Sequence, residues 1–246
     1  MKLRKLILAF TAAMTGMTAS AQNFEIESFT TPGGKKVEIT LIKHGTLAVS
    51  IGDFWIHVDP VGSYDPGNFS QFPKADVILV THEHGDHLDA AAIETLSKPQ
   101  TLLLVNAKSQ ESLQKGQAMA NGTSLWINDF LTIDAVAAYN NTEGHTNFHP
   151  KGNGNGYILN IDGLKIYVAG DTEDIEEMNA LSGIDVCFLP VNQPFTMTVD
   201  QAIKASLAIK PKVLIPYHYS NTDLKPLKDA LDKMDSGIDV RIRNMQ

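Results

Sequence analysis

The chain has 246 residues, including 8 histidines and 1 cysteine, and it carries a formal net charge of −8. This length fits one large domain or two small ones, and a hydrophobic fraction of 43% excludes a disordered chain. A single cysteine excludes a disulfide framework, a four-cysteine zinc site and a cysteine-ligated iron–sulfur cluster within one chain. The acidic balance argues against a general nucleic-acid binder. Any metal site must therefore be built from histidines and carboxylates.

Residues 1–21 have the composition of a secretory signal peptide. Three basic residues within Lys2–Lys5 precede an apolar stretch, Leu6–Met17, and Ala19–Ala21 forms a small-residue cleavage site. The apolar stretch is shorter than the roughly 20 residues that span a bilayer, so we expect cleavage and no stable membrane anchor. Cleavage would leave 17 of the 20 basic residues against 28 acidic ones, a net charge of −11. We therefore expect an exported protein, located in the periplasm.

The first half of the remaining chain begins with predicted strands joined by glycine-containing turns. Alternation of apolar and polar residues indicates strands with one buried face, and continuous apolar runs indicate strands buried on both faces. We expect strands at 37–43, 47–51, 54–58, 76–80, 101–105, 124–127 and 130–138, and helices at 88–96 and 107–117.

The second half repeats this pattern. We expect strands at 157–161, 165–169, 184–189, 213–217 and 240–243, and helices at 172–181, 198–209 and 224–234. A capping box at Thr198–Gln201 opens the second of these helices, and the glycine-rich stretch 151–156 is expected to be a loop. Two β-rich halves with helices on the outside predict the α/β class, as a sandwich of two sheets in one domain over residues 22–246.

The clearest motif is Thr81-His82-Glu83-His84-Gly85-Asp86-His87, between a predicted buried strand and a helix. Alternate residues at a strand end point the same way, so His82 and His84 can bind one metal ion. Asp86 and His87 lie at the turn into the helix and can serve a second ion, since paired metals lie about 3.5–4 Å apart. Imidazole and carboxylate ligands suit Zn²⁺, and also Fe or Mn. A merely polar loop would not explain this density of histidines.

Further candidate ligands occur at similar strand ends. Asp171 follows an apolar strand that ends in Gly170, and its carboxylate can bridge two ions, although a helix N-cap is the alternative. His218 ends the predicted strand 213–217. One more histidine is needed for the first ion, and both His145 and His149 precede the glycine-rich loop. We favour His149 because it lies closer to the next strand.

The pattern His-x-His-x-Asp-His, a Gly-Asp-Thr after a strand and a late strand-end His resembles the metallo-β-lactamase fold superfamily of metal-dependent hydrolases. The residues that carry this resemblance are His82, His84, Asp86, His87, Asp171 and His218. The resemblance covers nearly all of the chain after residue 21, and Val58-Asp59-Pro60 matches an early strand-end Asp motif. Residues 139–140 and 148–152 look like a subgroup similar to the ascorbate-6-phosphate lactonase and N-acyl phosphatidylethanolamine phospholipase D branches.

This resemblance implies a four-layer αββα sandwich of two mixed sheets, with metal ions between the sheets at one rim. It also implies the ligands of each ion: His82, His84 and His149 for the first, and Asp86, His87 and His218 for the second, with Asp171 as the bridge. Some superfamily members place the third histidine directly at the strand end, where this chain has Tyr139-Asn140. His145 therefore stays open as an alternative to His149.

A mechanism follows from two such ions. They would lower the pKa of a bridging water and supply hydroxide to attack a carbonyl carbon or a phosphorus. Asp86 is the candidate catalytic residue that orients this nucleophile and carries its proton. Asp59 can accept a hydrogen bond from a ligand imidazole, although a turn before Pro60 explains it equally well. We thus predict a dinuclear hydrolase of a small ester, lactone, amide or phosphoester, with two Zn²⁺ favoured over Mn²⁺ or Fe.

Other functions rank lower on the sequence. The main alternative is an iron-dependent redox enzyme on the same scaffold, but no flavin domain or persulfide-relay cysteine is visible. A non-catalytic metal protein fits less well, because structural sites are usually closed and mononuclear. β-Lactamase and nuclease activities are not favoured, and the partner is expected to be a small-molecule substrate rather than a nucleic acid. The identity of the substrate and the oligomeric state stay open.

The remaining histidines and the cysteine have simpler interpretations. His44 and His57 are expected to be surface or sheet residues. Cys187 lies in a predicted buried strand and is expected to be a core residue rather than a nucleophile. Three further residues could line the pocket: Asn192, Tyr217 and Tyr219. Tyr217 fits the core equally well.

Overall fold

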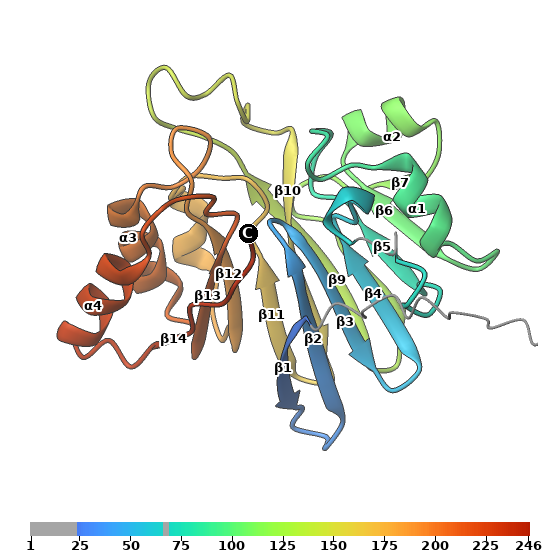
Figure 1. Cartoon of the computed structure of the whole chain (residues 1–246), viewed down its shortest axis with the longest axis horizontal. Coiled ribbons are helices and arrows are strands. Elements are labelled where there is room, and N and C mark those ends of the chain that lie inside the picture. The colour runs from blue at the N-terminus through green and yellow to red at the C-terminus, as the bar shows by residue number, and fades with distance from the viewer. Residues whose placement is uncertain (1–23, 66–68) are drawn as a thin grey trace, which may run out of the picture.

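Two seven-stranded sheets form the centre of the computed structural model, which describes residues 24–65 and 69–246 (Figure 1). The predicted signal peptide, residues 1–21, lies outside the described residues. The first sheet comprises β1 (Glu25–Thr30), β2 (Lys36–Lys43), β3 (Thr46–Ile51), β4 (Phe54–Val58), β5 (Val77–Leu79), β6 (Leu102–Val105) and β7 (Gln117–Ala118), in that order. The second comprises, from one edge to the other, β14 (Asp239–Val240), β13 (Val213–Tyr217), β12 (Val186–Pro190), β11 (Leu164–Val168), β10 (Gly154–Ile161), β9 (Leu131–Ala138) and β8 (Ser124–Asn128).

Four α-helices flank these sheets. In Figure 1, α1 (Ala90–Leu96) and α2 (Ala107–Leu113) lie beside β5–β7, whereas α3 (Val199–Ile209) and α4 (Lys225–Lys233) lie beside β12–β14. Two short 3₁₀ helices, η1 (Gly62–Tyr64) and η2 (Glu176–Ala180), complete the elements of the described chain. The main apolar core draws buried side chains from both sheets, and a smaller cluster packs α1 against the first sheet. The predicted α/β sandwich of two mixed sheets is confirmed.

Parallel strands bring the predicted site residues to one rim. Strands β4, β5 and β6 run parallel in the first sheet, and β11, β12 and β13 run parallel in the second. Every strand of a parallel set ends at the same side of its sheet, where ligand-binding loops of open α/β sheets collect. The loop after β5 and the residues after β11 and β13 therefore leave the sheets on the side where ligands can converge.

Glycine allows the two strands beside Asp171 to approach closely. Gly170 has φ +66°, and a Cβ there would lie 2.7 Å from the carbonyl oxygen of Asn155. A Cβ on Gly156 would lie 2.8 Å from the carbonyl oxygen of Ala169. Because β10 already begins at Gly154, the prediction of a loop over the whole of 151–156 is wrong for its last three residues. These glycines pack the strand against its neighbours, as close backbone approach requires.

Three other expectations differ from the structure. The predicted helix 172–181 is reduced to η2, because Thr172 and Glu173 instead bind the backbone of Tyr139. The last predicted strand, 240–243, is the two-residue β14, after which Arg241 and Arg243 turn to Glu27. Strand β1, which contains Glu27, was not expected at all.

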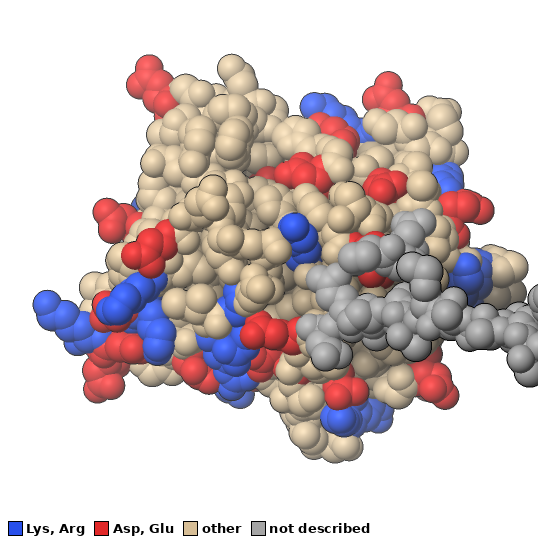
Figure 2. Space-filling model, viewed as in Figure 1, with Lys and Arg blue, Asp and Glu red and all other residues tan. Residues whose placement is uncertain are grey.

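Acidic and basic side chains are mixed over the face seen in Figure 2. Within residues 24–65 and 69–246, the helices are all too short or too polar for a membrane span.

Candidate metal centre

All seven predicted ligands meet at one rim of the sandwich. Their ligand atoms form three overlapping groups, each with its atoms within 4.8 Å of one another. The first group is His82, His84 and His149; the second is His44, Asp86, His87 and His218; the third is His82, His87 and Asp171. The structure thus brings together residues that are up to 174 positions apart in the chain, from His44 to His218.

The first group joins the loop after β5 to the loop between β9 and β10. His82 Nε2 lies 3.1 Å from His84 Nδ1. His149 donates from Nδ1 to the carbonyl oxygen of Phe195 at 3.0 Å, and this hydrogen bond directs its Nε2 toward Asp171 Oδ2, 3.2 Å away. Fixing one ring nitrogen in this way determines which nitrogen is free for a metal ion.

The second group contains the carboxylate of Asp86 and two stacked histidines. His87 Nε2 lies 3.8 Å and His218 Nε2 lies 3.5 Å from Asp86 Oδ2. The two imidazole rings are 5.2 Å apart with an interplanar angle of 18°. Both histidines are buried, whereas the Asp86 side chain is 42% exposed and borders the cavity.

Asp171 lies between these two groups. Its Oδ2 is 3.2 Å from His149 Nε2 and also 3.2 Å from His218 Nε2, and its Oδ1 is 3.3 Å from His87 Nε2. One buried carboxylate therefore faces histidines of both groups, which is the placement that a bridging ligand needs.

Asp59 supports the site from inside the first sheet. It is fully buried, and its Oδ2 lies 2.8 Å from His87 Nδ1. Its Oδ1 accepts the backbone N–H of Thr81 at 2.7 Å, and Oδ2 accepts the hydroxyl of the same residue. Asp59 thus has the predicted role: it orients a candidate ligand imidazole, whose Nε2 is left facing the other groups.

The donor set fits a cation at this place. Several buried ligand atoms lack a hydrogen-bond partner, namely His87 Nε2, His149 Nε2, His218 Nε2 and Asp171 Oδ1. Buried polar atoms are normally hydrogen-bonded; the three histidine nitrogens contact the Asp171 carboxylate only at ion-pair distances, so a bound cation would supply the partner that each of the four lacks. Imidazole nitrogens and carboxylate oxygens are ligands of Zn²⁺ and related ions. The residues present therefore fit divalent metal ions.

The pKa shifts also indicate that the carboxylates of this site are stabilised by positive charge. Burial alone would raise the pKa of Asp171, but the neighbouring His218 and His87 hold it well below its usual range. Burial would lower the pKa of His218, yet Asp171 and Asp86 raise it to about 9. Likewise, Asp171 and Asp59 raise the pKa of His87 well above its ordinary value despite burial. Protons on these histidines balance the carboxylates, and a divalent ion can replace them.

The structure separates His145 from His149. His145 Nδ1 lies 3.3 Å from Glu173 Oε1, outside the three ligand groups. Glu173 is fully buried, and its Oε2 accepts the backbone N–H groups of Asn141 and Thr142 at 2.7 and 2.6 Å. This carboxylate anchors the loop that carries His149, so the favoured alternative is the one that reaches the site.

His44 is the residue that the sequence analysis missed. Its Nε2 lies 3.1 Å from Asp86 Oδ2, and its ring is 3.7 Å from the ring of His218. The backbone also joins these residues, because the His218 N–H donates to the carbonyl oxygen of His44. Its position directly after a strand, before a glycine, was a usable signal, since the other candidate ligands follow strands as well. His44, expected to be a surface or sheet residue, thus lines the cavity beside Asp86.

A cavity of about 400 Å³ lies over the histidine groups. It is lined by His44, His84, Asp86, Phe148, His149, Asp171, Asn192, Phe195, His218 and Ser220. Of the three suggested pocket residues, only Asn192 belongs to this lining. Tyr217 lies in the core and accepts the N–H of Gly170, and Tyr219 donates to the carbonyl oxygen of Arg243. Cys187 is buried, as predicted.

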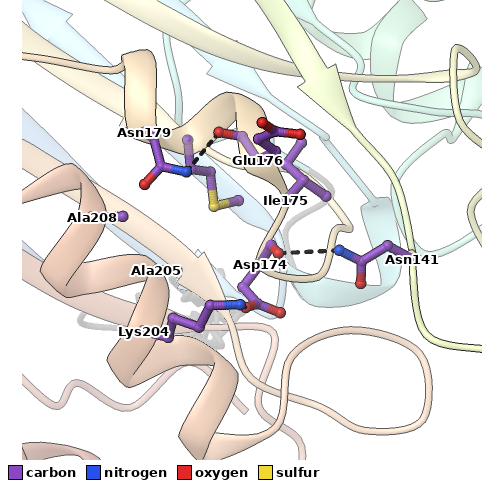
Figure 3. Close-up of a pocket in the computed structure, with 9 residues that line it drawn as sticks. Asn141, Asp174, Ile175, Glu176, Asn179, Lys204, Ala205 and Ala208 are labelled. Atoms are coloured by element: carbon purple, nitrogen blue, oxygen red, sulfur yellow. Dashed lines mark hydrogen bonds and ion pairs between the residues drawn. The ribbon is translucent and has the colours of Figure 1, made fainter.

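A second cavity, of about 310 Å³, is lined by residues of the 174–179 segment, which includes η2, and by residues of α3 (Figure 3). Its polar groups satisfy one another: Lys204 pairs with Asp174 at 2.6 Å, and Asn141 donates to the backbone of Asp174. Its lining contains no histidine among the described residues. We therefore place the chemistry in the cavity over the histidine groups.

Comparison with known sequences gives a consistent result. A model described as a beta-lactamase superfamily domain matches residues 38–218. A protein of Thermococcus kodakarensis named a metal-dependent hydrolase is 33% identical over 194 residues, which is 75% of this chain and 85% of that protein. A protein of Flavobacterium johnsoniae with the same name is 32% identical over 198 residues, covering 74% and 84% of the two chains.

Solved structures agree with the fold. The crystal structure of a protein described as a metal-dependent hydrolase, from Parabacteroides distasonis, has a TM-score of 0.87 and 52% identity. The match covers 91% of this chain and all of that one. A metallo hydrolase from Ignicoccus hospitalis, 23% identical, has the same fold with a TM-score of 0.71 over 85% of this chain and 95% of its own.

Proposed function

The chain belongs to the β-lactamase superfamily and is a metal-dependent hydrolase, and we propose that it works with two divalent metal ions. The observation that carries this proposal is the position of Asp171, whose carboxylate faces His149 and His218 at equal distances of 3.2 Å. A mononuclear site would use one histidine group and leave the other with unpartnered buried nitrogens, which is costly.

We assign the ligands as follows. His82, His84 and His149 would hold one ion, Asp86, His87 and His218 the other, and Asp171 would bridge them. This nitrogen-rich set favours Zn²⁺, and Mn²⁺ or Fe can be held by the same donors. Bound there, the ions would lower the pKa of a water and polarise the bond to be cleaved.

The protein's own residues prepare this step. Asp86 borders the cavity and is positioned to orient the attacking water and take its proton. His44 Nε2 lies 3.1 Å from Oδ2 of this carboxylate and so helps to fix its position. Asp59 and the carbonyl oxygen of Phe195 fix the rings of His87 and His149, so the histidines need little reorganisation. The cavity of about 400 Å³ suits a small ester, lactone, amide or phosphoester.

Metal stoichiometry tests the dinuclear proposal. The protein would be stripped with a chelator and titrated with ZnCl₂, with bound zinc measured by elemental analysis and hydrolysis followed in parallel. We expect two ions per chain and full activity only at the second. His84→Ala should lose turnover and retain less metal, whereas Trp126→Ala, an exposed residue outside the cavity, should behave as wild type.

Full activity with one ion per chain would contradict the two-ion mechanism. Iron as the ion retained on purification, together with oxygen-dependent turnover, would instead support the redox alternative.

We also propose that the protein acts in the periplasm after removal of residues 1–21. The basic, apolar and small-residue order of this segment supports the proposal. The test is N-terminal sequencing of the protein recovered from periplasmic and cytoplasmic fractions. A periplasmic product that begins at Gln22 is expected, and an uncleaved cytoplasmic product would refute it.

A further inference from the structure

The residues that line the cavity over the histidine groups fall into two sets. Six lining residues belong to the histidine and carboxylate groups, and the other four are Phe148, Asn192, Phe195 and Ser220. These four residues have no part in holding metal ions, so they define what else the cavity can bind. From them we propose that the substrate is an uncharged carboxylic ester or lactone with an apolar acyl chain or ring, an inference that rests on the proposed hydrolase function.

The apolar part of the substrate is indicated by an aromatic pair. The rings of Phe148 and Phe195 lie 5.1 Å apart in a T-shaped arrangement with an interplanar angle of 71°. Phe195 is 45% exposed, although a large apolar side chain gains by burial. An exposed aromatic residue at the rim of a cavity can recover this free energy by covering an apolar ligand group.

The backbone fixes this aromatic pair beside the reacting bond. The carbonyl oxygen of Phe195 accepts from His149 Nδ1 at 3.0 Å and from Asn140 Nδ2 at 2.8 Å. Phe148 is the residue immediately before His149. Both rings are thus tied to a candidate metal ligand, and an apolar group seated on them would lie next to the bond that is cleaved.

The charge of the lining argues for an uncharged carbonyl compound over a phosphoester. Enzymes that orient a phosphoryl group commonly use arginine or lysine, and the described residues that line the cavity include neither of these two types. Lys151, on the loop that carries His149, instead contacts Tyr139 Oη and Glu177 Oε1, both at 3.0 Å. It is absent from the described lining.

Neutral hydrogen-bonding groups complete the wall. Asn192 donates from Nδ2 to the hydroxyl of Ser220 at 3.1 Å, and this hydroxyl keeps its own proton for another acceptor. An ester or lactone offers such an acceptor in its oxygens. In the reaction, water adds to the acyl carbon, the bond from this carbon to the ester oxygen breaks, and that oxygen leaves with a proton. The products are a carboxylic acid and an alcohol, or one hydroxy acid from a lactone.

A matched substrate series tests the inference with the zinc-loaded protein. The probes are para-nitrophenyl acetate, butyrate and hexanoate, γ-lactones with alkyl chains of increasing length, and bis-para-nitrophenyl phosphate. Rates of the chelator-stripped protein are subtracted. Each methylene that the aromatic pair buries should raise kcat/KM about fourfold, so butyrate, with two more methylenes, should exceed acetate by about 15-fold. The phosphodiester should be cleaved much more slowly than the esters.

Two variants and a control assign the effect to the aromatic pair. Phe195→Ala should remove most of the chain-length dependence, because it deletes one ring of the aromatic pair and keeps the backbone carbonyl that holds His149. Phe195→Leu should keep part of the dependence. Trp126→Ala removes a side chain that is 63% exposed outside the cavity, and it should keep all of it.

The outcomes separate this inference from the proposed function. A zinc-dependent phosphodiesterase without ester or lactone activity would overturn the substrate class and leave the hydrolase mechanism standing. Ester hydrolysis with no chain-length dependence, or with a dependence that survives Phe195→Ala, would overturn the role of the aromatic pair. Absence of zinc-dependent turnover on every probe, with two zinc ions bound, would contradict both proposals.

Discussion

His57 offers a sharp test of how burial controls stability in this fold. The side chain is fully buried in β4, and neither ring nitrogen has a hydrogen-bond partner in the described structure. Its surroundings are aromatic: Phe72 and Phe69 meet the ring edge-on at 5.4 and 5.9 Å, and Trp55 lies 6.2 Å away. Burial in these surroundings lowers the pKa of His57 from 6.5 to about 3.

The direction of the pH effect follows from this lowered pKa. Between pH 6.5 and 3 the unfolded chain binds a proton on His57 and the folded protein does not, so acid favours unfolding. The free energy of unfolding should fall by about 1.4 kcal/mol for each pH unit in this range, to a limit of about 5 kcal/mol. The neutral ring also leaves one donor and one acceptor unpaired, at a cost of about 1–3 kcal/mol.

Replacement by leucine removes both effects. At pH 7.5, His57→Leu should be about 1–3 kcal/mol more stable than wild type. Between pH 7.5 and 5.0 this advantage should grow by about 2 kcal/mol, because only the wild type retains the titrating group. Urea unfolding of the chelator-stripped proteins, followed by circular dichroism at several pH values, measures the difference.

A second variant separates titration from polarity. His57→Gln keeps a buried polar group that does not titrate, so it should lose the pH dependence without the gain at pH 7.5. The reasoning would be refuted if His57→Leu and wild type lost stability in parallel from pH 7.5 to 5.0. That result would mean that the buried ring has a partner that stabilises its charged form.

Three further changes test the metal centre and its frame. Asp59→Asn should weaken zinc binding about 10–100-fold in a competition titration, because it removes the carboxylate that orients His87; unchanged affinity would exclude that role. Gly170→Ala should destabilise the protein by at least about 2 kcal/mol in urea unfolding, since its Cβ would meet a backbone oxygen at 2.7 Å and φ is +66°. Zinc binding at pH 7 should release about two protons, because the pKa of His218 is raised to about 9 and that of His87 well above its ordinary value. Affinity should therefore rise with pH toward 9, and calorimetry in buffers of different ionisation enthalpy counts the protons.

Local patterns in the sequence predicted most of the second sheet. Strand β13 is buried at every position and appears as a continuous apolar run, and α3 begins with the capping box that was recognised. Strand β1 was missed because its pattern is inverted. Ile26 is 57% exposed and Glu27 is buried, which is stable only because Arg241 and Arg243 reach it from the end of the chain. An ion pair across more than 200 residues leaves no periodic signal.

Site residues were likewise easiest to predict where they lie close together in the sequence. His82, His84, Asp86 and His87 were found because one short segment contains all four. His44 lies 42 residues before Asp86 and has no neighbouring partner in the sequence, so its position after a strand was the one local signal for it. Likewise, Thr172 and Glu173 look like the start of a helix, but their side chains are used to hold the loop that carries His149.

The two halves of the chain are both needed for either metal position. The first group takes His82 and His84 from the first sheet and His149 from the second, and the second group likewise needs His218 from across the sandwich. Both groups draw ligands from the two halves, so metal affinity depends on how the two sheets pack. Even the chain end takes part, since the carbonyl oxygen of Met245 accepts the N–H of His44. Asp59 fixes His87 on the side of the first sheet, and Glu173 fixes the loop that carries His149 on the side of the second, so each half holds its own ligands in place at the shared rim.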